Sequence, residues 1–281
     1  MTAVLLSLAG AVVYGTADFL GGLAAKRSAV TAVVVVSMIA GLVLVLLVMP
    51  LVPGRFDLPS FGWGAAAGVA GALALALFYR ALANGTMSIV APSTALMSAA
   101  VPVLAGLLLG ERPAPIALVG VVLGLAAVIL VSAEGGRLPT FRELASNRSA
   151  GEALLAGTGF GLFFVLLSRS ADESGLWPVV GARVASIALM TAIALLGRRA
   201  LVPPRAALPI IVITGIADMS ANVLFLLASR EGLLVVTSVL TALYPASTVI
   251  LAQVILKERL APLQLGGLGA AAGAVTLIAL G

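Results

Sequence analysis

The stretch GTMSIVAPSTALMSAAVPVLAGLLLGERPAPIALVGVVLGLAAVIL, residues 85–130, decides the fold because the chain repeats it. When the sequence is shifted by 147 residues, this stretch falls on residues 232–277, and 17 of the 46 aligned positions are identical. Shared Ala, Leu, Gly and Val are expected by chance in such a composition, but a shared pair of charges is not. Glu111-Arg112 falls on Glu258-Arg259, and the Ala-Pro pair after each corner also matches. The repeat predicts a duplicated unit of two apolar helices joined by a short polar corner.

The composition around this repeat indicates a membrane protein. Hydrophobic residues make up 62% of the 281 positions and charged residues only 10%, against about half and a quarter in soluble domains. Spanning a bilayer takes about 20 apolar residues in a helix, which satisfies every backbone polar group internally. The net charge of +5 comes without any basic run, so the sequence predicts no nucleic-acid partner.

The chain divides into ten predicted spans around one polar segment. The spans are Ala3–Ala24, Val30–Leu51, Trp63–Ala83, Ile89–Leu109, Ile116–Ser132, Ala153–Ser168, Val179–Leu196, Leu208–Ser229, Leu233–Leu256 and Leu263–Leu280. Residues 134–152 are the most polar segment and are expected to connect a first five-helix repeat, 1–133, to a second, 153–281.

The odd number of helices in each repeat has a topological consequence. The second repeat must enter the membrane from the opposite side, so the two repeats are inverted. The predicted fold is therefore an all-α polytopic membrane protein with ten transmembrane helices in two inverted five-helix repeats. This plan recurs in secondary transporters, whose substrate site lies near the midplane between the repeats. The other interpretation is that duplication is only how a large membrane protein grew.

Several motifs resemble those of the drug/metabolite transporter superfamily, and within it the EamA family. They are the corners Gly110-Glu111-Arg112 and Lys257-Glu258-Arg259 and the pairs Tyr14-Gly15 and Phe160-Gly161. The resemblance covers nearly the whole chain. It implies a secondary transporter of the bacterial cytoplasmic membrane that moves amino acids, other small metabolites or organic cations, often as an exporter. The expected partners are the lipid bilayer, a small-molecule substrate and protons, with the chain a monomer or homodimer.

The two indications of orientation disagree. Eleven basic residues fall in loops that follow odd-numbered spans and four in loops that follow even-numbered spans. The positive-inside rule then places the odd loops in the cytoplasm and both termini outside. The resemblance implies cytoplasmic termini, so the sequence leaves the orientation open.

Polar groups inside the spans are the candidate site. The chain has 16 basic and 11 acidic residues, and only Asp18, Arg183 and Asp218 lie well inside a span. A charge at the bilayer centre costs about 3 kcal/mol on insertion scales, so each needs a partner or a wet cavity. The predicted substrate- and proton-binding residues are Tyr14, Asp18, Arg183, Asp218, Asn222, Thr241 and Tyr244. The alternatives are a structural ion pair, an Asn that joins helices, and Thr hydroxyls bonded to their own helix.

Three prolines inside the spans are predicted kinks that could also serve as hinges: Pro92, Pro102 and Pro245. The small-residue pairs, such as Gly64 and Gly68, are expected to be close-packing positions instead.

Two further function classes compete with transport. An enzyme would need a convergent nucleophile, base or metal set, yet the chain has no His and no Cys, and no metal or cofactor site is predicted. A passive facilitator or channel, or a non-transport membrane subunit, remains the alternative. The Walker motif is absent from the sequence, so ATP is not the direct energy source. Two acids against one base favour a cationic or zwitterionic solute, exchanged for protons by alternating access.

Overall fold

The computed structural model describes residues 1–133, 136–138, 140 and 148–281, with Met87 and Ser88 described by their backbone only. The α-helices in this part of the chain are α1 (Thr2–Ala25), α2 (Val30–Val48), α3 (Leu58–Asn84), α4 (Met87–Leu108), α5 (Pro115–Val131), α7 (Arg148–Leu167), α8 (Trp177–Leu196), α9 (Leu208–Glu231), α10 (Leu234–Ala242), α11 (Tyr244–Leu256) and α12 (Pro262–Leu280). Short 3-10 turns occur at Met49–Leu51, Asp172–Ser174 and Arg205–Ala207, and the described residues form no strand.

The described helices cross the membrane ten times, as predicted. Nine segments are long and apolar enough to span a bilayer, and α10 and α11 together make one of them, Leu234–Leu256. The remaining crossing is α5, which has 17 residues and is the shortest. Its composition compensates for its length, because no residue from Pro115 to Val131 has a polar side chain.

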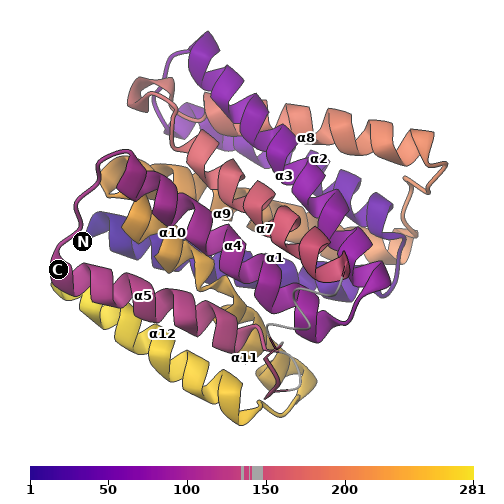
Figure 1. Cartoon of the computed structure of the whole chain (residues 1–281). Coiled ribbons are helices and arrows are strands. Elements are labelled where there is room, and N and C mark those ends of the chain that lie inside the picture. The colour runs from indigo at the N-terminus through magenta and orange to yellow at the C-terminus, as the bar shows by residue number, and fades with distance from the viewer. Residues whose placement is uncertain (134–135, 139, 141–147) are drawn as a thin grey trace.

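The packing of the helices has an internal two-fold pattern. Helix α1 packs on α9 as its counterpart α7 packs on α3, and α2 packs on α9 as α8 packs on α3. The last helix of each repeat, α5 or α12, packs against the other (Figure 1). Each contact therefore has a partner contact in which the two halves exchange roles, which is what a two-fold axis between five-helix repeats produces.

The direction of α5 and α12 shows that the repeats are inverted. Gly281, after α12, lies beside Ile116 and Ala117 at the start of α5, whereas Gly267 in α12 lies beside Val131 at the end of α5. Equivalent helices of the two repeats thus run antiparallel. The predicted class, two inverted repeats of five helices, is confirmed.

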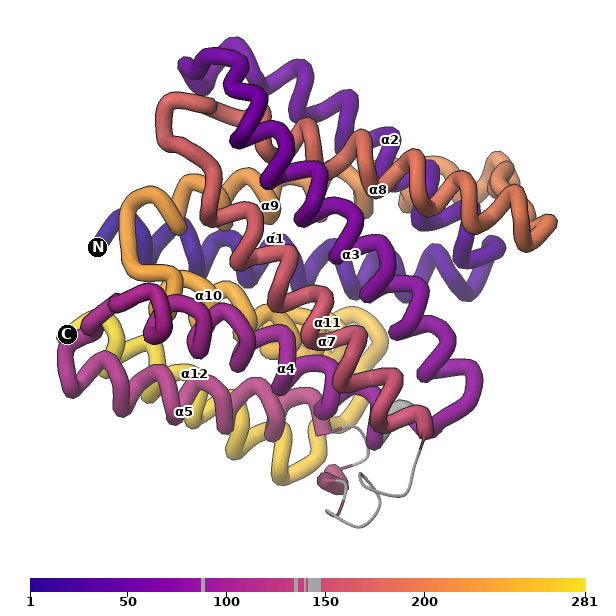
Figure 2. Tube along the Cα trace, turned by 45° about the horizontal axis from the view of Figure 1, so that its top comes forward, coloured from indigo at the N-terminus to yellow at the C-terminus, as the bar shows by residue number. Residues whose placement is uncertain are grey.

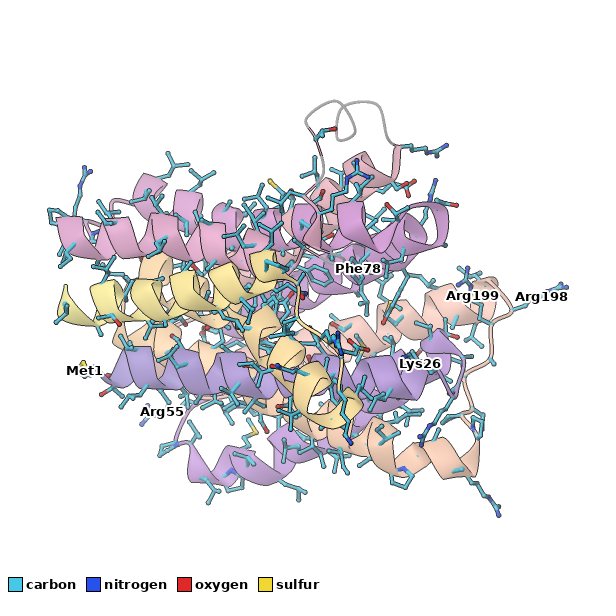
Figure 3. The ribbon with its side chains drawn as sticks, turned by 90° about the horizontal axis from the view of Figure 1, so that it is seen from below. Met1, Lys26, Arg55, Phe78, Arg198 and Arg199 are labelled. Atoms are coloured by element: carbon cyan, nitrogen blue, oxygen red, sulfur yellow. The ribbon has the colours of Figure 1, made fainter. Side chains whose placement is uncertain are left out.

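The loops lie at two opposite ends of this bundle. Figure 3 shows Met1 and Arg55 at one end and Lys26, Arg198 and Arg199 at the other. The tube in Figure 2 places both termini at the first of these ends. We call them the terminal end and the connector end, since α5 ends and α7 begins at the second.

Two helices begin earlier than the sequence predicted. Helix α7 starts at Arg148 instead of Ala153, because the Arg148 guanidinium pairs with the Glu152 carboxylate one turn later, at 3.4 Å. Glu152 also pairs with Arg80 of α3, at 3.1 Å. Helix α3 starts at Leu58 rather than Trp63, with an N-terminal cap at the preceding residue. Residues 134, 135, 139 and 141–147 of the predicted connector lie outside the described residues.

Candidate functional site

An ion pair between α8 and α9 is the core of the candidate site. Nη2 of Arg183 donates to Oδ2 of Asp218 at 2.6 Å. The Arg183 side chain is only 10% exposed, whereas that of Asp218 is 38% exposed. Asn222, one turn further along α9, donates to the backbone carbonyl of Asp218 at 2.7 Å and approaches its Oδ2 at 3.4 Å. The buried Arg183 guanidinium therefore binds one side of the Asp218 carboxylate, and the rest of that carboxylate stays accessible.

Close contacts between small residues bring these groups together. A Cβ on Gly68 of α3 would lie 2.0 Å from the carbonyl oxygen of Ala182, the residue before Arg183, and Ser186 donates to the Gly68 carbonyl at 2.9 Å. On α9, a Cβ at Gly215 would lie 2.0 Å from the carbonyl oxygen of Ser37 in α2. These two contacts occupy equivalent places in the two-fold pattern, and together they set α8 and α9 at the distance that the ion pair requires.

Asp18 faces the same region from α1. One flank of α1 packs on α9, where Gly21 lies beside Thr214, and another packs on α11, where Gly15 lies beside Tyr244. Asp18 lies on the face between these two flanks, and it is exposed. The carboxylates of Asp18 and Asp218 are close enough to repel each other electrostatically. The structure thus brings the three charges predicted from the sequence into one neighbourhood, with Asp218 rather than Asp18 paired to Arg183.

Tyrosine rings surround the two carboxylates. The rings of Tyr14 and Tyr244 lie 6.1 Å apart between centroids, and Tyr14 meets Phe164 edge to face at 6.2 Å. The close approach at Gly15 allows this, since a Cβ there would lie 2.5 Å from the Tyr244 carbonyl oxygen. Asp18 interacts electrostatically with the hydroxyls of Tyr244 and of Tyr79 in α3. The sequence analysis missed Tyr79, although the chain has only three tyrosines and all of them gather here.

Thr241 differs from the other predicted residues. It is fully buried in α10, and its hydroxyl has no hydrogen-bond partner among the described residues. Other hydroxyls near the site have backbone partners. Thr214 donates to the Ile210 carbonyl of its own helix at 2.8 Å, and Thr248 donates to Tyr244 of its own helix at 3.3 Å and to Gly15 of α1 at 3.1 Å. Thr241 therefore has an unpartnered hydroxyl in the buried part of the ninth crossing.

The predicted kink positions behave differently from one another. Helix α4 continues through Pro92 and Pro102 without interruption. The ninth crossing instead divides at Leu243, and Pro245 lies in the first turn of α11. The residue before a proline disfavours the helical conformation, which accounts for a break on the N-terminal side of Pro245. The break lies beside Tyr244 and so borders the candidate site.

The charged and aromatic side chains of this region determine which ligands it could bind. Two carboxylates and one guanidinium give a formal charge of −1, and phenol rings add negative π-faces that attract cations. The described residues contain no cluster of three His, Cys, Asp or Glu side chains that could hold a metal ion. The groups are suited to bind a cation reversibly or to take up a proton, whereas no activated nucleophile accompanies them.

Comparisons with known proteins bear on the family and on the fold. A family model, described as the EamA-like transporter family, matches residues 1–133 and 150–280. A solved structure described as "Crystal structure of protein" is similar to this chain, with a TM-score of 0.80 and 18% sequence identity, covering 99% of this chain and 96% of that chain. At that identity the likeness concerns the fold. No curated protein matches the sequence.

Proposed function

Because this chain belongs to the EamA-like transporter family, we propose that it is a secondary active transporter that exports a small amine, amino acid or organic cation in exchange for protons. Family membership and the apolar helices make it a multi-pass integral membrane transporter and not an enzyme. We place it in the bacterial cytoplasmic membrane. The direction, the coupling ion and the solute class are the parts that we propose.

The observation that carries the proposal is the pair of accessible carboxylates inside the bundle. Asp18 and Asp218 lie in membrane-spanning helices, where an unpaired charge is costly, and yet the first is exposed and the second partly so. Of these two carboxylates, only that of Asp218 has an arginine partner among the described residues. We propose that the two acids face one water-filled cavity near the midplane, where water offsets the cost of the charges.

The residues take distinct roles in this mechanism. Asp18 and Asp218 bind either the cationic group of the solute or protons, so that binding of one releases the other. Arg183 pairs with the Asp218 carboxylate while no solute is bound, and Asn222 fixes the position of that carboxylate. The rings of Tyr14 and Tyr244 supply π-faces for the cationic group, and Tyr79 and Thr241 complete the wall.

Alternating access would arise from movement of helix groups around this site. We propose that each moving group combines helices of both repeats, because α1 and α2 pack on α9 whereas α7 and α8 pack on α3. The break before Pro245 would act as one hinge, with Pro92 and Pro102 as weaker ones in the unbroken counterpart helix. Inverted repeats give such a movement two equivalent end states, one open at each end of the bundle.

Purified protein in proteoliposomes tests the proposal. A panel of amines, amino acids and organic cations is supplied under an imposed pH gradient, and uptake is compared for the wild type, Asp18→Asn and Asp218→Asn. Asn keeps the shape of Asp and removes its titration. We expect both variants to insert normally and to lose pH-driven uptake, while Asp172→Asn, an exposed loop acid that is 79% accessible, transports as the wild type does.

Two results would contradict the proposal. Normal pH-driven uptake by both Asn variants would place the coupling elsewhere and leave the two acids with a structural role. Uptake that follows the solute gradient but ignores the pH gradient in the wild type would identify a facilitator instead.

A further inference from the structure

The corner after α4 joins the two repeats at the terminal end. Oε1 of Glu111 accepts from the backbone N–H of Leu234 at 2.8 Å, and Oε2 accepts from that of Val235 at 2.9 Å. These are the first two residues of α10, in the other repeat. The first N–H groups of a helix have no partner within it, and the helix dipole favours a negative charge there. Glu111 thus caps the start of α10 and joins it to the end of α4.

The backbone of this corner is built for that contact. Gly110 has a positive φ of 92°, and the N–H of Glu111 returns to the Gly106 carbonyl at 3.0 Å, which ends α4 and turns the chain back over it. A Cβ on Gly106 would lie 2.6 Å from Oε2 of Glu111 and 2.7 Å from Val235. The absence of a side chain at position 106 therefore leaves the space in which the carboxylate meets α10.

The equivalent corner at the connector end is open. The 147-residue shift places Glu258 on Glu111 and Lys257 on Gly110, and Lys257 also has a positive φ, 57°. Glu258 is nevertheless exposed, and so is Gln253, which occupies the place of Gly106. The two corners share a backbone turn and a carboxylate, but among the described residues only the carboxylate at the terminal end is hydrogen-bonded to the other repeat.

The ninth crossing shows the same asymmetry independently. Its half at the terminal end, α10, has eight buried residues among nine, whereas the half at the connector end, α11, has none. The counterpart helix α4 is continuous. The break at Leu243 therefore separates a buried half, held by Glu111, from a half without buried residues that ends at Leu256, just before the corner with Glu258.

We propose that Glu111 and Glu258 are alternating latches, each of which closes one end of the transporter by capping the first turn of a helix in the other repeat. Glu111 caps α10, and Glu258 caps α4. In this structure Glu111 is engaged and the terminal end is closed. In the opposite state Glu111 leaves α10, and Glu258 caps the backbone of residues 87 and 88, the counterparts of Leu234 and Val235. This inference rests on the alternating access proposed above and adds the contact that selects between its two states.

The two latches differ in the space available to their carboxylates. Gly106 gives Glu111 an open seat, whereas the side chain of Gln253 has to move aside before Glu258 can occupy its own. Gln253→Gly should therefore strengthen the second latch and populate the opposite state. This variant changes no residue of the ion pair or the tyrosine cluster.

Cysteine accessibility tests the latches without any solute. The chain has no cysteine, so Ser238→Cys places one reporter in α10, at a position that is 1% exposed. A membrane-impermeant maleimide is applied from the side that labels an exposed marker, Thr2→Cys. We expect Glu111→Ala and Gln253→Gly each to raise the labelling rate at Ser238→Cys about tenfold, which corresponds to about 1.4 kcal/mol. Glu111→Gln, which keeps one acceptor oxygen, should fall between, and Glu258→Ala should leave the reporter protected.

The controls separate a latch from general damage. Each variant must elute as a single species in detergent, and Glu111→Gln provides the test if Glu111→Ala does not fold. The latch would be overturned if Ser238→Cys stayed protected in both Glu111 variants. It would also be overturned if Glu258→Ala raised the labelling rate as much as Glu111→Ala does. Failure of proton-coupled uptake would leave these labelling results unaffected, so the two proposals fail separately.

Discussion

Replacing the members of the Arg183–Asp218 ion pair one at a time should destabilise the protein unequally. The Arg183 side chain is 10% exposed and that of Asp218 is 38% exposed, with 2.6 Å between their atoms. At an effective dielectric constant of about 20, two unit charges at that distance attract by about 6 kcal/mol. Most of this attraction is offset, because the guanidinium loses its hydration and because water at the carboxylate screens the charge. Asp218→Asn leaves a buried, unpaired guanidinium and should cost about 2–3 kcal/mol, whereas Arg183→Gln leaves a hydrated carboxylate and should cost about 1 kcal/mol.

A double-mutant cycle measures this difference. Thermal unfolding in detergent is followed for the wild type, Asp218→Asn, Arg183→Gln and the double variant, and about 2–3 kcal/mol corresponds to a fall in Tm of roughly 5–10 °C. We expect Asp218→Asn to be the less stable single variant and the double variant to recover part of its loss. The coupling energy should be about 1–2 kcal/mol. Additive losses, or a larger loss in Arg183→Gln, would refute the asymmetric ion pair.

Two further predictions concern the scaffold. Gly68→Ala places a Cβ against the backbone oxygen of Ala182 and should cost about 1–3 kcal/mol, read as a lower Tm. Gly62→Ala on the same helix meets no atom within 4 Å and should be neutral or stabilising; equal losses in both would contradict the close packing of α3 on α8. Hydrogen bonds from the Ser60 hydroxyl and N–H lower the pKa of Asp57, so its ionised cap stabilises α3 above about pH 4 and this stability is lost as pH falls. Asp57→Ala should therefore lower Tm at pH 7, and the deficit should shrink in acid; a deficit independent of pH would exclude the charged cap.

The fold was largely predictable because its determinants are local or repeated. Span length and apolar composition predict the crossings, and the Glu-Arg corner repeated at Glu111 and Glu258 predicts the inverted halves. Helix starts were less accurate, since they depend on side-chain contacts. Arg148 extends α7 through Glu152, a pairing that hydropathy does not register.

The site was predictable only where a charge stands out against an apolar span. Asp18, Arg183 and Asp218 are conspicuous for that reason, and the structure brings them together. Tyr79 lies next to Arg80 near the end of its span, and nothing in its own helix indicates the long-range packing that carries it to Asp18. The sequence shows Glu111 only as part of a polar corner, because its partner Leu234 is 123 residues away in the sequence.

The most direct test of the account is the movement of protons when a solute gradient alone is applied. Proteoliposomes containing the protein and an internal pH indicator are given a gradient of a transported amine or amino acid, with no initial pH difference. The account predicts that the wild type moves protons in the direction opposite to the solute. The double variant that carries both Asp18→Asn and Asp218→Asn should move no protons, and Asp172→Asn should match the wild type. Solute flux without proton movement in the wild type, or proton movement that persists in the double variant, would contradict it.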